Sequence, residues 1–97
     1  MVRNAYLKKI EEKLEDWEWE IARIKEKADK VQGDARILYD EQLKVLRAKQ
    51  KAARERLQDV REAGADSWGK FKTGVETALD DLKKAIDTAV SKLKKSA

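Results

Sequence analysis

Apolar side chains recur every three or four residues along almost the whole chain, and no proline interrupts them. The first series consists of Leu7, Ile10, Leu14, Trp17, Ile21, Ile24, Ala28 and Val31. This alternation places all its members on one narrow stripe of an α-helix. Proline, the strongest helix breaker, is absent from every position. The spacing therefore predicts an all-α protein whose helices pack as an antiparallel coiled coil or helical bundle.

Two further apolar series follow with the same spacing. The second consists of Tyr39, Leu43, Leu46, Gln50, Ala53, Leu57 and Val60. The third consists of Trp68, Phe71, Val75, Leu79, Leu82, Ile86, Val90 and Leu93. A chain of 97 residues has room for one small domain. We therefore expect a single helical domain, residues 1–97, with helical stretches at about 3–31, 35–63 and 66–95.

The joint between the second and third stretches is marked by Gly64-Ala65-Asp66-Ser67. Glycine can adopt the left-handed conformation that follows many helices, and Asp66 or Ser67 can cap the next amino terminus. We expect the last helix to fold back after Gly64.

The joint at Gln32-Gly33-Asp34 is open to two interpretations. In the favoured one, a long helix runs through or kinks near Gly33, since an interior glycine costs only about 1 kcal/mol relative to alanine. The third stretch then covers half of that helix, and the uncovered half drives self-association as an antiparallel dimer. In the alternative, Gly33 and Asp34 form a tight hairpin and the chain is a monomeric three-helix bundle.

Charge is distributed unevenly. Residues 11–20 carry six acids and one lysine, and residues 44–56 carry one acid, Glu55, and six bases. Those bases are Lys44, Arg47, Lys49, Lys51, Arg54 and Arg56. Antiparallel pairing about residues 32–34 sets the acidic block beside the basic one, and each flanking pair contributes a few tenths of a kcal/mol.

Catalytic chemistry is not indicated. The chain has no cysteine and no histidine, which excludes thiolate chemistry, histidine catalysis and Cys/His zinc sites. The carboxylates of Glu11, Glu15 and Glu18 share a helical face, which we interpret as a solvated acidic surface and not as a metal site. We expect no enzyme activity, no cofactor and no bound metal. The apolar runs are far shorter than the roughly 20 residues that span a bilayer, so we expect a cytoplasmic protein.

Four aromatic residues are candidates for an interaction surface: Trp17, Trp19, Trp68 and Phe71. Trp17 and Trp19 cannot share one narrow stripe, so either the apolar face is wide or Trp19 marks a second contact surface. Trp68 and Phe71, flanked by Lys70 and Lys72, begin a stripe that could lie on a membrane surface or dock onto the other helices. The basic residues of 44–56 form a candidate nucleic-acid patch, although the net charge is only +4.

The segment from Asp66 to Ala85, which includes Trp68 and Lys72-Thr-Gly-Val-Glu76, resembles the C-terminal part of small bacterial coiled-coil proteins. Tyr39-Asp-Glu-Gln-Leu43 and Leu46-Arg-Ala-Lys49 resemble their middle part. Some of these proteins are described as stress-response proteins. The resemblance implies a continuous first helix, because its members have a helix former where this chain has Gly33, and it supplies no catalytic residues.

Three functional hypotheses follow, in decreasing order of support. The first is a non-enzymatic interaction or scaffold protein, associated with stress, that binds itself or another protein. The second is a peripheral membrane binder acting through residues 66–95. The third is a weak nucleic-acid binder acting through residues 44–56.

Overall fold

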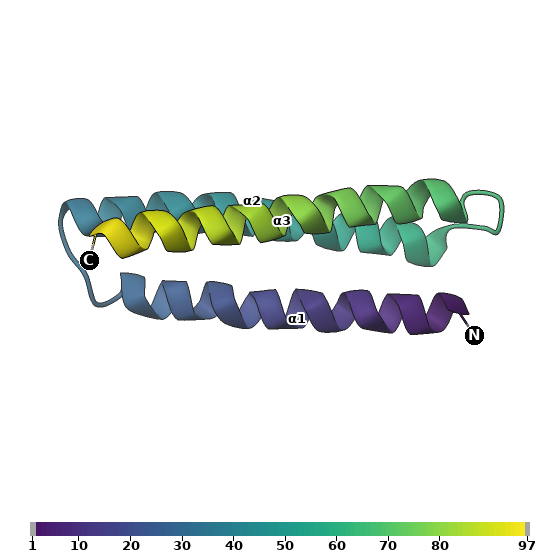
Figure 1. Ribbon diagram of the computed structural model, residues 1–97, viewed down its shortest axis with the longest axis horizontal. Helices are drawn as coiled ribbons and strands as arrows, with labels where there is room; N and C mark the ends of the chain where they lie inside the picture. Colours follow the sequence, from purple (N-terminus) through teal and green to yellow (C-terminus); the bar gives the residue numbers. More distant parts are fainter. Residues whose placement is uncertain (1, 97) are drawn as a thin grey trace.

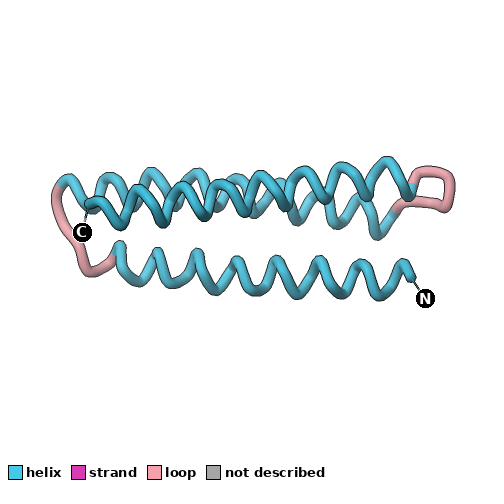
Figure 2. Tube along the Cα trace, in the orientation of Figure 1, coloured by secondary structure: helices cyan, strands magenta, loops and turns pink. Residues whose placement is uncertain are grey.

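Three long helices form an elongated bundle in the computed structural model, which describes the backbone of residues 2–96 and the side chains of residues 3–94. They are α1 (Val2–Ala28), α2 (Asp34–Glu62) and α3 (Trp68–Ser96). Successive helices run antiparallel and make a rod of 51 × 18 × 17 Å (Figure 1). Two short loops join them at opposite ends of the rod (Figure 2). The predicted all-α bundle is confirmed, and the described residues form no strand.

The core is built from the three apolar series. Leu46, Leu82 and Val75 have essentially no exposed surface, and Ile21 has little. Gln50 is also buried, as its place in the second series predicts. The third series is wrong at one position. Val90 was expected in the core but is 43% exposed, and its neighbour Ala89 is fully buried instead.

The favoured prediction of one long helix through Gly33 is wrong. Helix α1 ends at Ala28, the chain reverses over five residues, and α2 begins at Asp34. Gly33 precedes α2 with a φ of +67° and a ψ of −140°, a conformation that is readily open only to glycine. The hairpin covers the seam of α1 within the same chain, so the uncovered half-seam proposed for a dimer is not present.

An arginine holds this reversal closed. The Arg36 Nη1 atom donates a hydrogen bond of 2.7 Å to the carbonyl oxygen of Ala28, the last residue of α1. The same guanidinium pairs with Asp40 at 3.0 Å and with Asp29 at 3.3 Å. A helix end leaves carbonyl groups without partners, so Arg36 both caps α1 and ties it to the first turn of α2.

The reversal after α2 uses a different backbone. The chain folds back after Gly64 as predicted, but Gly64 does not have a positive φ. Ala63 ends α2 in an extended conformation, with a φ of −68° and a ψ of 136°. Ser67 stands immediately before α3, and its carbonyl oxygen accepts the bond from the Phe71 amide at 3.1 Å. Of the two residues predicted to cap α3, Ser67 is the one at the N-cap position, which its backbone carbonyl defines.

The helices are not equally close to one another. Helices α2 and α3 pack tightly along their length, whereas α1 contacts α2 less closely and α3 least of all (Figure 1). Gly74 of α3 faces α2, where a Cβ placed on it would make an ordinary contact of 3.7 Å with Cδ of Arg56. Ala78 and Ala85 follow on the same stripe of α3, four and eleven residues later.

Candidate interaction surface on the first two helices

The four candidate aromatic residues divide into two groups. Trp17, Trp68 and Phe71 are partly buried and pack against the core. Trp19 lies elsewhere on α1, and 65% of its surface is exposed. Two helical residues that are two positions apart point in directions about 160° apart, which explains why only one of the first two tryptophans reaches the core. Of the four candidates, Trp19 is therefore the one that remains available for an interaction surface.

Trp68 belongs to a cluster at one end of the rod. Its ring meets that of Tyr6 edge-on, with centroids 5.5 Å apart, and the guanidinium of Arg3 lies 4.9 Å from the Trp68 ring. The Tyr6 hydroxyl donates a hydrogen bond of 3.0 Å to Glu76. Burial, the hydrogen bond to Glu76 and the charge of Glu76 together raise the pKa of Tyr6 to about 12.

Arg3 also caps the end of α2. It donates hydrogen bonds of 2.7 Å to the carbonyl oxygen of Val60 and 2.6 Å to that of Ala63. Sequence reasoning missed this residue, because its partners lie 57 and 60 positions away and nothing local marks it. Together with Tyr6, Arg3 joins the start of α1 to the loop between α2 and α3, so this end of the rod has a structural role.

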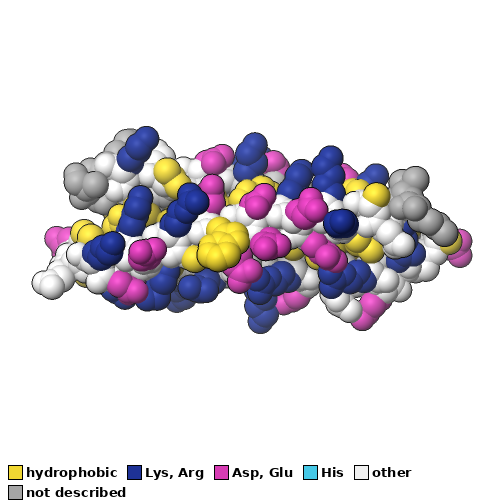
Figure 3. Space-filling view, turned by 90° about the horizontal axis from the view of Figure 1, so that it is seen from below, with side chains coloured by type: hydrophobic (Ala, Val, Ile, Leu, Met, Phe, Trp, Pro, Cys, Tyr) yellow, Lys and Arg dark blue, Asp and Glu magenta, His cyan; other side chains and the backbone are white. Residues whose placement is uncertain are grey.

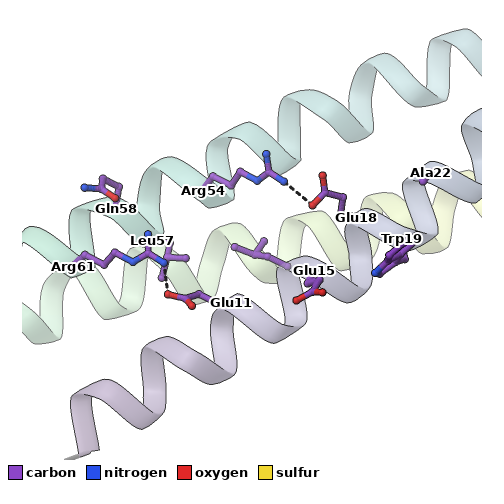
Figure 4. Close-up of a pocket in the computed structure, with 10 residues that line it drawn as sticks. Glu11, Glu15, Glu18, Trp19, Ala22, Arg54, Leu57, Gln58 and Arg61 are labelled. Carbon is purple, nitrogen blue, oxygen red and sulfur yellow. Dashed lines mark hydrogen bonds and ion pairs between the residues drawn. The ribbon is translucent and has the colours of Figure 1, made fainter.

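A groove of about 780 Å³ runs between α1 and α2 beside Trp19 (Figure 4). Leu14 and Leu57 contribute its apolar part, and Trp19 and Ala22 line it from α1. The polar lining consists of Glu11, Glu15, Glu18, Arg54, Gln58 and Arg61. An exposed indole beside a groove is typical of a surface that binds another protein.

Two ion pairs cross this groove. Arg54 of α2 pairs with Glu18 of α1 at 2.9 Å, and Arg61 pairs with Glu11 (Figure 4). The acidic block therefore lies alongside α2, as the antiparallel charge argument predicts. One of its partners, Arg61, lies beyond the basic stretch 44–56.

The remaining acids near Trp19 are not used within the chain. Glu12, Glu15 and Asp16 precede Trp19 by seven, four and three residues, which places them on the same outer surface of α1. All three are exposed and form no ion pair with another described residue. Figure 3 looks onto the α1 side and shows acidic side chains gathered around an exposed apolar patch in the middle of the rod.

The structure splits the candidate basic patch between the two flanks of α2. Arg47, Lys51 and Arg54 line a shallow depression on the α1 side, and Lys44 lies on the same stripe. Arg56 lies against α3 near Gly74, and Lys49 shares its stripe. Arg54 and Arg56 form ion pairs with Glu18 and Asp59, so Lys44, Arg47 and Lys51 are the unpaired bases of the α1 flank among the described side chains.

The apolar stripe of α3 is occupied. Val75, Leu79, Leu82, Ile86 and Leu93 lie in the core, and Trp68 and Phe71 pack against it. No described helix combines the length and the apolar character needed to cross a membrane. Of the acids in residues 11–20, Glu11 and Glu18 contact arginines, and no group of three or more carboxylates within the described residues is arranged to hold a metal ion.

Comparison of the chain with known protein families, with characterised proteins and with solved structures finds no match. The resemblance to small bacterial coiled-coil proteins thus rests on the quoted residues alone and stays a prediction.

Proposed function

We propose that this chain is a non-enzymatic interaction protein that binds a protein partner through the side of the bundle formed by α1 and α2. The observation that carries the proposal is Trp19, which is 65% exposed beside the groove between α1 and α2 while the other two tryptophans pack against the core. Tryptophan is the residue type most enriched among those that dominate binding energy at interfaces.

The surroundings of Trp19 support a specific contact over random exposure of an apolar residue. Leu14, Ala22 and Leu57 line the groove beside the indole, and the ion pairs of Arg54 and Arg61 cross it. A partner would bury the indole at the centre and leave the charged groups at the rim, which is the usual arrangement of a binding surface.

The experiment is affinity purification of the native chain with its bound proteins, compared with Trp19→Ala. Val90→Ala is a matched control, because Val90 is also an exposed apolar residue but lies on α3. We expect proteins that remain bound to the wild type and to Val90→Ala and are lost with Trp19→Ala. Equal retention by all three chains would contradict the proposal.

Two other outcomes would replace it. Flotation with anionic vesicles would favour membrane binding, which requires α3 to leave the bundle because its apolar stripe lies in the core. A salt-sensitive shift of mixed-sequence duplex DNA, abolished by Arg47→Glu, would favour nucleic-acid binding through the unpaired bases of α2. The cytoplasmic location and the association with stress also remain predictions, and measuring the protein's abundance under stress tests the latter.

A further inference from the structure

Helices α1 and α3 leave a groove of their own between them, which Trp19 does not line. Its volume is about 410 Å³, within the usual range of small-molecule sites. The apolar part of its lining consists of Tyr6, Ile10, Trp17 and Leu79. Ile10 and Leu79 are buried, whereas Tyr6 and Trp17 are only partly buried, so aromatic surface is open in this groove.

Two carboxylates also line the groove, and both have partners. Glu76 accepts a hydrogen bond of 3.0 Å from the hydroxyl of Tyr6. Asp80 pairs at 2.9 Å with Lys84, which lies outside the lining. Because Lys84 offsets the charge of Asp80, Glu76 is the acid whose negative charge remains in the lining.

Three lysines of the lining outweigh that charge. Lys9 and Lys13 lie one turn apart on α1, and Lys83 lies on α3. All three are exposed, and none forms an ion pair with another described side chain. Lys72 adds an ammonium group nearby, 5.0 Å from the centre of the Tyr6 ring. The groove therefore combines an apolar lining with an excess of unpaired positive charge.

The middle of this seam is not locked. Helix α1 is tied at its two ends, by Arg3 to the end of α2 and by Ala28 to Arg36. The Tyr6–Glu76 hydrogen bond joins α1 to α3 near the start of α1, and no ion pair between described side chains joins these two helices. They are also the pair of helices that contact each other least. A small molecule can therefore lie between them without breaking an ion pair.

We propose that this groove binds a free carboxylate that carries one short aliphatic chain, such as a medium-chain fatty acid. The chain lies along the apolar lining, and the carboxylate pairs with the ammonium groups of Lys9, Lys13 or Lys83. Hydrogen bonds between an ammonium group and a carboxylate are stronger than those between neutral groups. The inference goes beyond the proposed function, because the protein partner is expected at Trp19 and the fatty acid is not.

Charge and size select this class of ligand. Unpaired ammonium groups favour an anion over a cation with the same chain. A groove of about 410 Å³ accommodates one short chain, whereas the two long chains of a membrane phospholipid need far more room. The ammonium groups are exposed, so their attraction is weakened by water and salt. We therefore expect a dissociation constant of roughly 0.1 to 1 mM for decanoate at low salt.

Isothermal titration with decanoate tests the role of the lysines. We expect saturable binding of decanoate and none of decyltrimethylammonium, which has the same chain and the opposite charge. Lys9→Glu/Lys13→Glu is expected to weaken decanoate binding by about tenfold, since each change replaces an attraction by a repulsion. Lys44→Glu/Lys51→Glu is the matched control, because it changes the net charge equally on α2, away from this groove. Circular dichroism verifies that both variants keep their helices.

Tryptophan fluorescence tests the location. Trp17 lines the groove and Trp19 does not. Decanoate is expected to change the emission of the wild type and of Trp19→Phe, and to have much less effect on Trp17→Phe. An emission change that is undiminished in Trp17→Phe would place the ligand elsewhere and overturn the proposal.

Three calorimetric results would also overturn it. They are no saturable decanoate binding up to about 5 mM, equal binding of decyltrimethylammonium, and equal weakening by the two double lysine variants. Flotation with anionic vesicles that requires Lys9 and Lys13, without decanoate binding, would assign these lysines to a membrane surface instead. None of these results affects the proposed protein partner, whose test depends on Trp19→Ala.

Discussion

All three helices share one core, but the residues between them differ in size. Small residues lie between α2 and α3, and bulky residues lie between α1 and α3. Gly74, Ala78 and Ala85 line the stripe of α3 that approaches α2, and the two backbones come close. Between α1 and α3, the space is lined by bulky residues such as Tyr6, Ile10 and Trp17, and the helices stay apart. Helices with the same apolar spacing can therefore pack closely, as α2 and α3 do, or lie farther apart, as α1 and α3 do.

The consequence for stability is that the hairpin and α1 depend on different interactions. The α2–α3 pair relies on buried aliphatic packing along its length. Helix α1 is also held by hydrogen bonds at both of its ends. At its start, Arg3 binds carbonyl groups at the end of α2, and at its end, Ala28 accepts a hydrogen bond from Arg36 of α2.

The largest effect is expected from Leu82→Ala. Leu82 is fully buried on α3, and removing its side chain leaves a cavity that costs about 2–5 kcal/mol of unfolding free energy. Leu7→Ala on α1 is the matched control, and we expect a smaller loss because Leu7 is only partly buried. Urea unfolding followed by circular dichroism measures both variants. Equal losses would show that α1 is packed as firmly as the hairpin.

A smaller effect is expected from Arg3→Ala. This change removes three charged hydrogen bonds to backbone carbonyl groups at the end of α2 and the contact with the Trp68 ring, at a cost of about 1–2 kcal/mol. Arg23→Ala, an exposed change on the same helix, should stay within about 0.5 kcal/mol of the wild type. Hydrogen exchange should quicken in the last turn of α2 for the first variant only. If the two arginine variants behave alike, the tie at this end contributes nothing.

The smallest effect concerns pH and Tyr6. The pKa of Tyr6 is about 12 in the bundle and about 10 in an unfolded chain, so the folded state binds the phenolic proton more tightly. This contribution is complete below pH 10 and is lost as the pH rises through 12. Between these values the wild type should therefore lose more stability than Tyr6→Phe. Lysine deprotonation affects both chains, and their difference isolates Tyr6.

Titration of tyrosinate absorbance supplies the independent measurement. The difference between the wild type and Tyr6→Phe gives the titration of Tyr6 alone, with an expected midpoint near 12. Glu76→Gln should lower that midpoint, since the carboxylate charge would be gone. A midpoint near 10 in the wild type would mean that Tyr6 does not bind Glu76. The hydrogen bond that joins α1 to α3 would then be absent.

The apolar spacing predicted the fold class and most of the core, because residues three and four positions apart share one face of a helix. It did not settle whether the first two stretches form one helix or two. The sequence did not reveal which glycine reverses the chain by a left-handed turn. Gly33 does so and Gly64 does not, and the choice depends on contacts such as Arg36 with Ala28 that form only after the chain has turned. Arg3 was missed for the same reason, since its partners are distant in sequence.

Prediction of the candidate site was mixed in a similar way. The spacing showed that Trp17 and Trp19 face different ways, and the structure identifies Trp19 as the exposed one. The basic stretch looked continuous in the sequence but divides between two flanks of α2, because residues two apart, such as Lys49 and Lys51, cannot share a stripe. The unpaired acids of α1 and the unpaired bases of α2 were recognised only after the ion pairs of Glu11, Glu18, Arg54 and Arg61 were known.

Because the rod contains three antiparallel helices, the two ends of the chain lie at opposite ends of it. The chain enters at one end of the bundle and leaves at the other, and the longest extent of the rod is 51 Å (Figure 1). Two bodies fused to the beginning and the end of this polypeptide would be kept apart by about the rod's length instead of being brought together. The molecule would then serve as a spacer of fixed length, which energy transfer between two attached dyes would measure.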